Sequence, residues 1–217
     1  MSGKSKLDAL SDQVLMALLE KHACPLPFHG VRALFMGNIA TPDMTASPMQ
    51  TIRDLWGGEL PEFETQKDAE ILLTGLMQGL WNGLSEHQNR TNPFKLIRVK
   101  NPQPSWETLT RLSLLRREEL DGFIEGLFAG HEEIDLPEKA HKATNILGEI
   151  RAMLAGLHTL AGTKATPTDI KELEAMIKQV RELSIIAEKE INVVIQSCKR
   201  ARAHILETYT AEKPVMH

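Results

Sequence analysis

The chain has 217 residues, of which 42% are apolar and 25% are charged, and its formal net charge is −4 at neutral pH. The apolar content is that of a folded globular protein and excludes an intrinsically disordered chain. The negative net charge argues against broad electrostatic capture of nucleic acid or anionic lipid, because both need a surplus of Lys and Arg on one face. We therefore do not expect a nucleic acid or a membrane as a partner.

The cysteines and the N-terminal segment bear on the cellular compartment of the protein. Cys24 and Cys198 are far apart in the sequence and have no metal-ligand spacing, so we expect neither a disulfide framework nor an oxidising environment. Residues 1–23 have the pattern of an amphipathic helix rather than of a signal peptide. No segment approaches the roughly 20 apolar residues that a membrane-spanning helix requires. The sequence thus predicts a cytoplasmic protein.

Apolar residues recur at helical spacing along most of the chain. Leu72, Leu76, Leu80 and Leu84 fall at four-residue steps, and no long alternating run of β-branched residues competes with this pattern. Prolines divide the first half of the chain, which predicts several short helices there. We therefore expect an all-α fold with a compact multi-helix bundle.

Residues 87–104 are rich in Asn and Pro and are predicted to form a loop. A new helix is expected to begin near Ser105, whose side chain can cap it. We accordingly expect a helical body over residues 1–135, divided by this loop into two lobes.

The remaining residues, 136–217, are predicted to form a long antiparallel helical hairpin. Apolar residues from Ala143 to Ala161 step by three and four residues, and the turn-forming stretch 162–168 separates them from a second series with the same heptad spacing. The first helix is expected to run from about Glu138 to Ala161. The second helix is expected to have about 40 residues and a length of roughly 60 Å.

Because the first of these helices covers only about half of the second, part of the apolar stripe on the last helix lacks a cover within the hairpin. We expect it to contact a protein partner or another copy of the chain, or else to pack on the body. The candidate partner-binding side chains are Ile170, Leu173, Ile177, Val180, Ile191 and Val194.

Five segments resemble a known family. They are residues 29–37 (HGVRALFMG), 52–58 (IRDLWGG), 61–63 (PEF), 69–72 (AEIL) and 119–130 (ELDGFIEGLFAG). Together they resemble the YecA/YgfB-like family of small helical bacterial proteins, over about residues 25–160. The resemblance implies an all-α fold and a bacterial origin, with some members linked to regulation or protein handling.

Some members of that family end in a short zinc-binding module rich in Cys and His. Residues 203–217 contain no cysteine, so this module is absent and zinc binding is not carried over with the resemblance. The family-like glycines, Gly30, Gly37, Gly122, Gly126 and Gly130, fit positions where helices approach closely or end.

Chemistry-bearing residues form few recognisable patterns. Two groups could hold a metal ion, although neither has a known ligand spacing; they are His22, Cys24 and His29, and His131, Glu132, Glu133 and His141. No nucleophile motif or phosphate-binding loop is present in the sequence, and no cofactor is expected.

The last helix ends in a basic group formed by Lys199, Arg200, Arg202 and His204. Residues 166–217 as a whole contain eight Lys or Arg and eight Asp or Glu, so the segment is not a basic arm. The preferred prediction is a non-enzymatic helical protein for protein–protein interaction, regulation or assembly. The alternative is a metal-binding protein or a metal-dependent enzyme that uses a His cluster.

Overall fold

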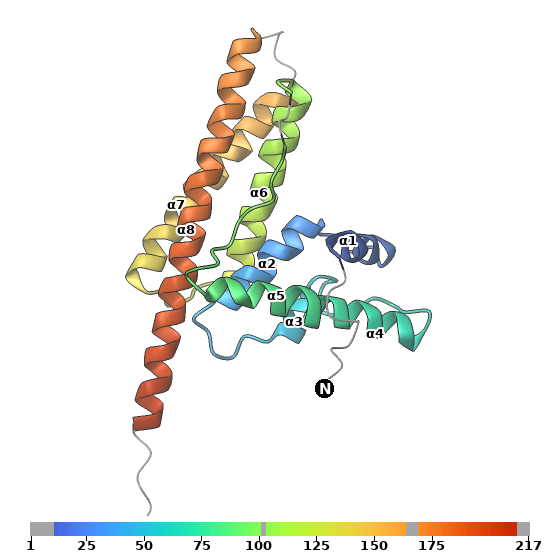
Figure 1. The fold of residues 1–217 in the computed structure, drawn as a ribbon, viewed down its shortest axis with the longest axis vertical. Coiled ribbons are helices and arrows are strands. Elements are labelled where there is room, and N and C mark those ends of the chain that lie inside the picture. Colours follow the sequence, from blue (N-terminus) through green and yellow to red (C-terminus); the bar gives the residue numbers. More distant parts are fainter. Residues whose placement is uncertain (1–10, 101–102, 164–168, 212–217) are drawn as a thin grey trace, which may run out of the picture.

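The computed structural model describes residues 11–100, 103–163 and 169–211, and within these ranges it contains helices and no strand. The all-α prediction is confirmed. None of the helices in these ranges has the length and apolar character needed to cross a membrane. Three long helices, α6, α7 and α8, run along the long axis of the molecule, and the shorter helices lie beside them (Figure 1).

The helices of the first half are short, as the prolines predict. They are α1 (Asp12–Lys21), α2 (Phe28–Ala40), α3 (Pro48–Asp54), α4 (Gln66–Thr74), the π-helix η1 (Gly75–Trp81), α5 (Asn82–Ser85) and the 3₁₀-helix η2 (Glu86–Gln88). The long helices follow. They are α6 (Trp106–Phe128), α7 (Glu138–Gly162) and α8 (Ile170–Ala211).

Local sequence signals set the ends of α6. The Ser105 hydroxyl accepts a hydrogen bond of 3.0 Å from the backbone N–H of Thr108, which confirms the predicted cap. At the other end, Ala129 and Gly130 have φ values of 50° and 83°. This left-handed pair ends the helix and turns the chain toward α7.

Glycines allow α2 and α6 to cross with their backbones in contact. A Cβ atom placed on Gly126 would lie 1.9 Å from the carbonyl oxygen of Leu34, and one on Gly37 would lie 2.1 Å from the carbonyl oxygen of Phe123. At Gly122 the corresponding distance, to the Gly30 carbonyl oxygen, is 2.5 Å. No other residue type has room at these three positions, so the predicted close approach is confirmed there.

The long helices share one core with the rest of the chain. α8 has 42 residues and packs on α7, α6 and α2, while α6 packs on both α2 and α7. A single buried apolar cluster contains residues from Leu15 to Cys198. The boundary predicted near residue 135 therefore crosses a continuous core, and α2 and α6 pack together although the loop at 87–104 separates them in sequence.

Candidate functional site

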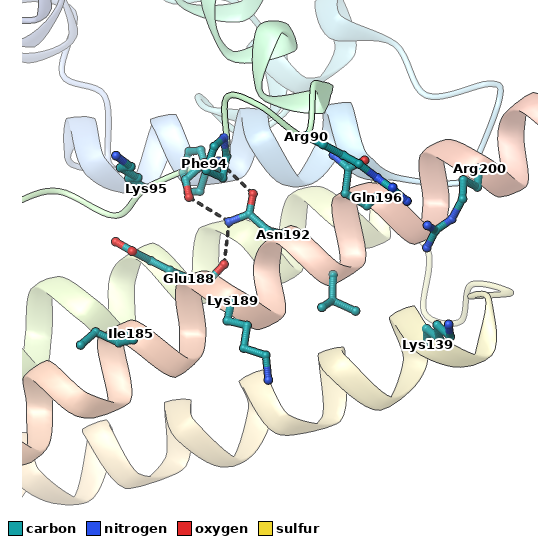
Figure 2. Close-up of a pocket in the computed structure, with 12 residues that line it drawn as sticks. Arg90, Phe94, Lys95, Lys139, Ile185, Glu188, Lys189, Asn192, Gln196 and Arg200 are labelled. Atoms are coloured by element: carbon teal, nitrogen blue, oxygen red, sulfur yellow. Dashed lines mark hydrogen bonds between the residues drawn. The ribbon is translucent and has the colours of Figure 1, made fainter.

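An extended segment crosses the surface of the long helices. We call residues 93–99 the strap. Its Phe94 is held by both backbone groups, because the N–H donates to Oδ1 of Asn192 and the carbonyl oxygen accepts from Nδ2 of the same side chain, each at 2.9 Å (Figure 2). One amide side chain on α8 thus replaces the two hydrogen bonds that a neighbouring strand would supply.

Side chains at four-residue steps on α8 bind the strap and the chain before it. Glu188 accepts from the Leu96 N–H at 2.9 Å and forms an ion pair with Arg98 at 2.8 Å. Gln196, two steps further along than Glu188, donates to the Gln88 carbonyl oxygen at 3.1 Å. Residues four apart lie on one face of a helix, so this polar row forms a continuous seat for an extended chain.

A buried ion pair fixes the strap from the side of α6. Arg116 is 6% exposed and Glu119 is 1% exposed, and the guanidinium donates to the Glu119 carboxylate. Both also bind Ile97, whose N–H donates to Glu119 at 2.8 Å and whose carbonyl oxygen accepts from Arg116 at 2.5 Å. Arg116 also donates to the Ser184 hydroxyl at 3.0 Å, so this network joins α6, the strap and α8.

Burial raises the pKa of the Glu119 carboxyl, while the Arg116 guanidinium and the Ile97 N–H act in the opposite direction. Burial is the largest of these influences, so the pKa of the carboxyl lies above its ordinary value.

The strap borders an open groove of about 720 Å³. Pro93 and Phe94 of the strap form one side, and Ile185 and Val193 of α8 form part of the floor. Ile185 is 64% exposed, which is unusual for so large an apolar side chain. The groove therefore combines a rigid polar seat with accessible apolar surface.

The rim of this groove is basic although the chain has a net charge of −4. Five cationic side chains from three segments line it, as Figure 2 shows. They are Arg90 and Lys95 from the strap and the residues just before it, Lys139 from α7, and Lys189 and Arg200 from α8. Glu188 is the one acidic side chain among the described residues that line it, and Arg98 and the Leu96 N–H already bind its carboxylate. We call this feature the basic groove.

Beyond Ile185 the same positive character continues. A smaller cavity of about 220 Å³ shares Ile185 with the basic groove and is lined by Arg98, Arg116 and Arg181. Arg116 is committed to the buried network, whereas Arg98 and Arg181 are exposed. Cationic side chains thus line both cavities along this part of α8.

Removal of the Asn192 amide should release the strap. In Asn192→Ala the two backbone groups of Phe94 lose their partners in a part-buried setting, so we expect a loss of about 1–3 kcal/mol in the free energy of unfolding. The Phe94 amide hydrogen should exchange faster with solvent, because its local hydrogen bond is lost. The Leu109 amide hydrogen, within α6, should exchange faster only to the extent that the free energy of global unfolding falls.

Asn145→Ala is the matched control, because Asn145 is exposed on α7 and has only a long contact of 3.5 Å with His141. Equal protection of Phe94 in the two variants would contradict the role given to Asn192.

The predicted partner-binding residues lie elsewhere. Leu173, Ile177, Val180, Ile191 and Val194 are all less than 9% exposed and pack within the chain's own core or at its edge, whereas Ile170 is 58% exposed. α8 packs on α6 and α2 as well as on α7, so the body covers the stripe that α7 leaves open. In this arrangement the five buried side chains face the chain's own core, whereas Ile170 is accessible to solvent.

Exposed apolar side chains of α7 lie at a different place. Ile146, Met153 and Leu160 follow a seven-residue spacing and are 36%, 50% and 41% exposed. Their spacing places them on one face of α7, outside the lining of the basic groove.

The two predicted metal clusters are not assembled. His29 Nε2 lies 2.7 Å from the Glu118 carboxylate, His131 Nε2 lies 3.0 Å from Asp43, and the His22 ring packs on Phe63. In the described part of the chain no group of three or more His, Cys, Asp or Glu side chains is placed to hold a metal ion.

The thiols are not activated. Burial raises the pKa of the Cys198 thiol to about 11 and also raises the pKa of Cys24.

The basic residues near the end of α8 have different roles. Arg202 donates to the carbonyl oxygens of Ile39 and Thr41 at the end of α2 and to the Gln88 side chain, so it fastens α8 to the body. Arg200 is exposed and lines the basic groove. The sequence pattern singled out Arg200, but it gave no sign that Arg90, Lys95 and Lys139 would join it.

No family model matches the chain, and no curated protein or solved structure matches it. The resemblance to the YecA/YgfB-like family remains a prediction.

Proposed function

We propose that the protein is a non-enzymatic interaction protein whose basic groove binds an acidic segment of a partner protein. The observation that carries this proposal is the set of five cationic side chains around an exposed apolar floor. Carboxylates of the partner would pair with the cations at the rim, and its apolar side chains would cover Ile185 and Val193. Charge complementarity of this kind sets the orientation and the rate of association.

The rigidity of the groove favours binding. Asn192, Glu188 and Arg116 hold the strap by its backbone, so one wall is fixed before a partner arrives. A preformed site loses less conformational entropy on association than a site that must be ordered by its ligand. The groove can therefore select an acidic segment without a large rearrangement.

An acidic protein segment fits the groove better than a nucleic acid does. Single-stranded nucleic acids are commonly bound by stacking of bases on exposed aromatic side chains. The aromatic side chain in the groove, Phe94, is 1% exposed and lies under the Arg32 guanidinium at 4.4 Å from the ring centroid, so it offers no stacking surface. Pro93 and Ile185 instead offer aliphatic contacts that suit apolar side chains.

The composition of the groove supports a binding role rather than catalysis. Its described lining contains no Ser, Cys or His, and its carboxylate, on Glu188, is engaged by two donors. General acid–base and nucleophilic catalysis most often use such groups when they are free to reach the substrate. The lysines of the rim are exposed, whereas a lysine nucleophile is activated by burial in an apolar pocket.

Affinity isolation with charge-reversed variants tests the proposal. The full chain is immobilised and exposed to nuclease-treated native lysate, in parallel with the variant Lys189→Glu/Arg200→Glu. We expect the unaltered chain to retain an acidic protein that elutes as the salt concentration rises, and the variant to lose it, because two rim cations become anions.

Lys171→Glu/Lys178→Glu is the matched control, since it makes the same change in net charge on exposed positions of α8 outside the groove. This control should retain the partner. Retention of the same proteins by all three forms, retention of no protein, or retention only of untagged copies of this chain would contradict the proposal.

A further inference from the structure

A second cavity lies between α6, the first turn of α2 and the end of the strap. Its volume is about 550 Å³, and it shares no lining residue with the basic groove. Cavities of about 300–1,000 Å³ with apolar walls and a few polar groups are typical of sites for small molecules. Its lining has this composition.

The wall of the cavity is aliphatic. Leu112, Leu114 and Leu115 of α6 and Val99 of the strap line it. Leu114 and Leu115 remain only half-buried, so part of their surface is accessible from the cavity. A ligand with an apolar body would remove this surface from water.

Charged groups lie around the same cavity. Arg98, Lys100 and Arg111 are its three cations, and Glu118 is the one carboxylate among its described lining residues. The Glu118 carboxylate is bound by His29 at 2.7 Å, and Arg98 is paired with Glu188. Lys100 and Arg111 are exposed and have no ion pair within the described part of the chain, so they can receive an anion.

We propose that this cavity binds a small organic anion with an apolar body, of the class of medium-chain carboxylates. The head group accepts charge-assisted hydrogen bonds from Lys100 and Arg111, and the hydrocarbon body lies on the leucine wall of α6. A hydrophilic anion would leave the leucines exposed to water, and a neutral hydrocarbon would leave the two cations without a counter-charge. The two halves of the site therefore select an amphipathic anion.

Titration of the full chain with decanoate, followed by calorimetry and by amide chemical shifts, tests this proposal. We expect saturable binding with shift changes concentrated in residues 98–100 and 111–118. The variant Lys100→Gln/Arg111→Gln should weaken decanoate binding about tenfold or more, because each lost charge-assisted hydrogen bond contributes on that scale. The neutral analogue 1-decanol should bind the unaltered chain more weakly by a similar factor.

Arg53→Gln/Lys67→Gln is the matched control, since Arg53 and Lys67 are exposed cations outside the cavity, and it should bind decanoate as the unaltered chain does. Equal affinity for decanoate and 1-decanol, unchanged binding in the double variant, or shift changes spread over the whole surface would overturn the proposal. Lys189→Glu/Arg200→Glu, which alters only the basic groove, should bind decanoate as the unaltered chain does. Failure of the decanoate proposal can therefore be told apart from failure of the partner-binding proposal.

Discussion

Replacement of Gly126 by alanine is expected to lower the free energy of unfolding by about 3 kcal/mol or more. The added Cβ would lie 1.9 Å from the Leu34 carbonyl oxygen and 2.8 Å from its carbon, and both are backbone atoms. A side chain can rotate away from such a contact, but a helix backbone can only move as a whole. α2 and α6 would therefore separate, and the core between them would lose its packing. Urea denaturation followed by far-ultraviolet circular dichroism measures the change.

Gly156→Ala on α7 is the matched control for this substitution. Gly156 lies inside a helix and is exposed, and a Cβ there meets no heavy atom within 4 Å. Alanine has the higher helix propensity, so this variant should gain about 0.5–1 kcal/mol. A loss of stability in Gly126→Ala together with a gain in Gly156→Ala would show that the crossing of α2 with α6 determines the effect, and not the loss of a glycine as such. A neutral Gly126→Ala would contradict the backbone contact of α2 with α6.

Loss of the Arg116 guanidinium should have an effect of similar size. Arg116→Met leaves the Glu119 carboxylate in the core with the Ile97 N–H but without its counter-charge, and we expect a loss of about 3–5 kcal/mol at neutral pH. Arg116→Met/Glu119→Gln removes both charges and keeps an acceptor for the Ile97 N–H. This double variant should recover a substantial part of the loss.

The pH dependence of Arg116→Met separates charge from packing. Burial raises the pKa of the Glu119 carboxyl above its ordinary value, and without Arg116 the main opposing influence is gone. In this variant the pKa of Glu119 is higher in the folded state than in the unfolded state. At a pH between these two values the folded chain holds a proton on Glu119 that the unfolded chain has released. The free energy of unfolding of the variant should therefore rise as pH falls from neutral toward 4.5. Equal losses in the single and double variants, with no such pH dependence, would contradict a buried charge pair.

Local signals in the sequence predicted the long helices well. The apolar spacing and the turn-forming residues predicted a helix from about Glu138 to Ala161, and α7 spans Glu138–Gly162. The prediction of about 40 residues for the last helix compares with 42 in α8. Ser105 was identified as a cap because capping depends on neighbours within one helical turn.

What covers the apolar stripe of α8 depends on long-range packing, which periodicity does not specify. An apolar stripe is compatible with an interface or with a core, and here α6 and α2 cover most of it. The polar row of Glu188, Asn192 and Gln196 carried a four-residue signal of its own. Because the strap that it binds lies 98 residues away at Phe94 and 92 residues away at Leu96, the partner of that row was not evident from sequence.

Photo-crosslinking from the basic groove tests the central claim most directly. A benzoylphenylalanine is introduced in place of Ile185, which lies in the groove, or in place of Met153, which is comparably exposed on α7 outside it. We expect irradiation in native lysate to join an acidic protein to the chain from position 185 and not from position 153, with the product lost at high salt. Crosslinking of the partner from position 153 alone, or equally from both positions, would contradict binding in the basic groove.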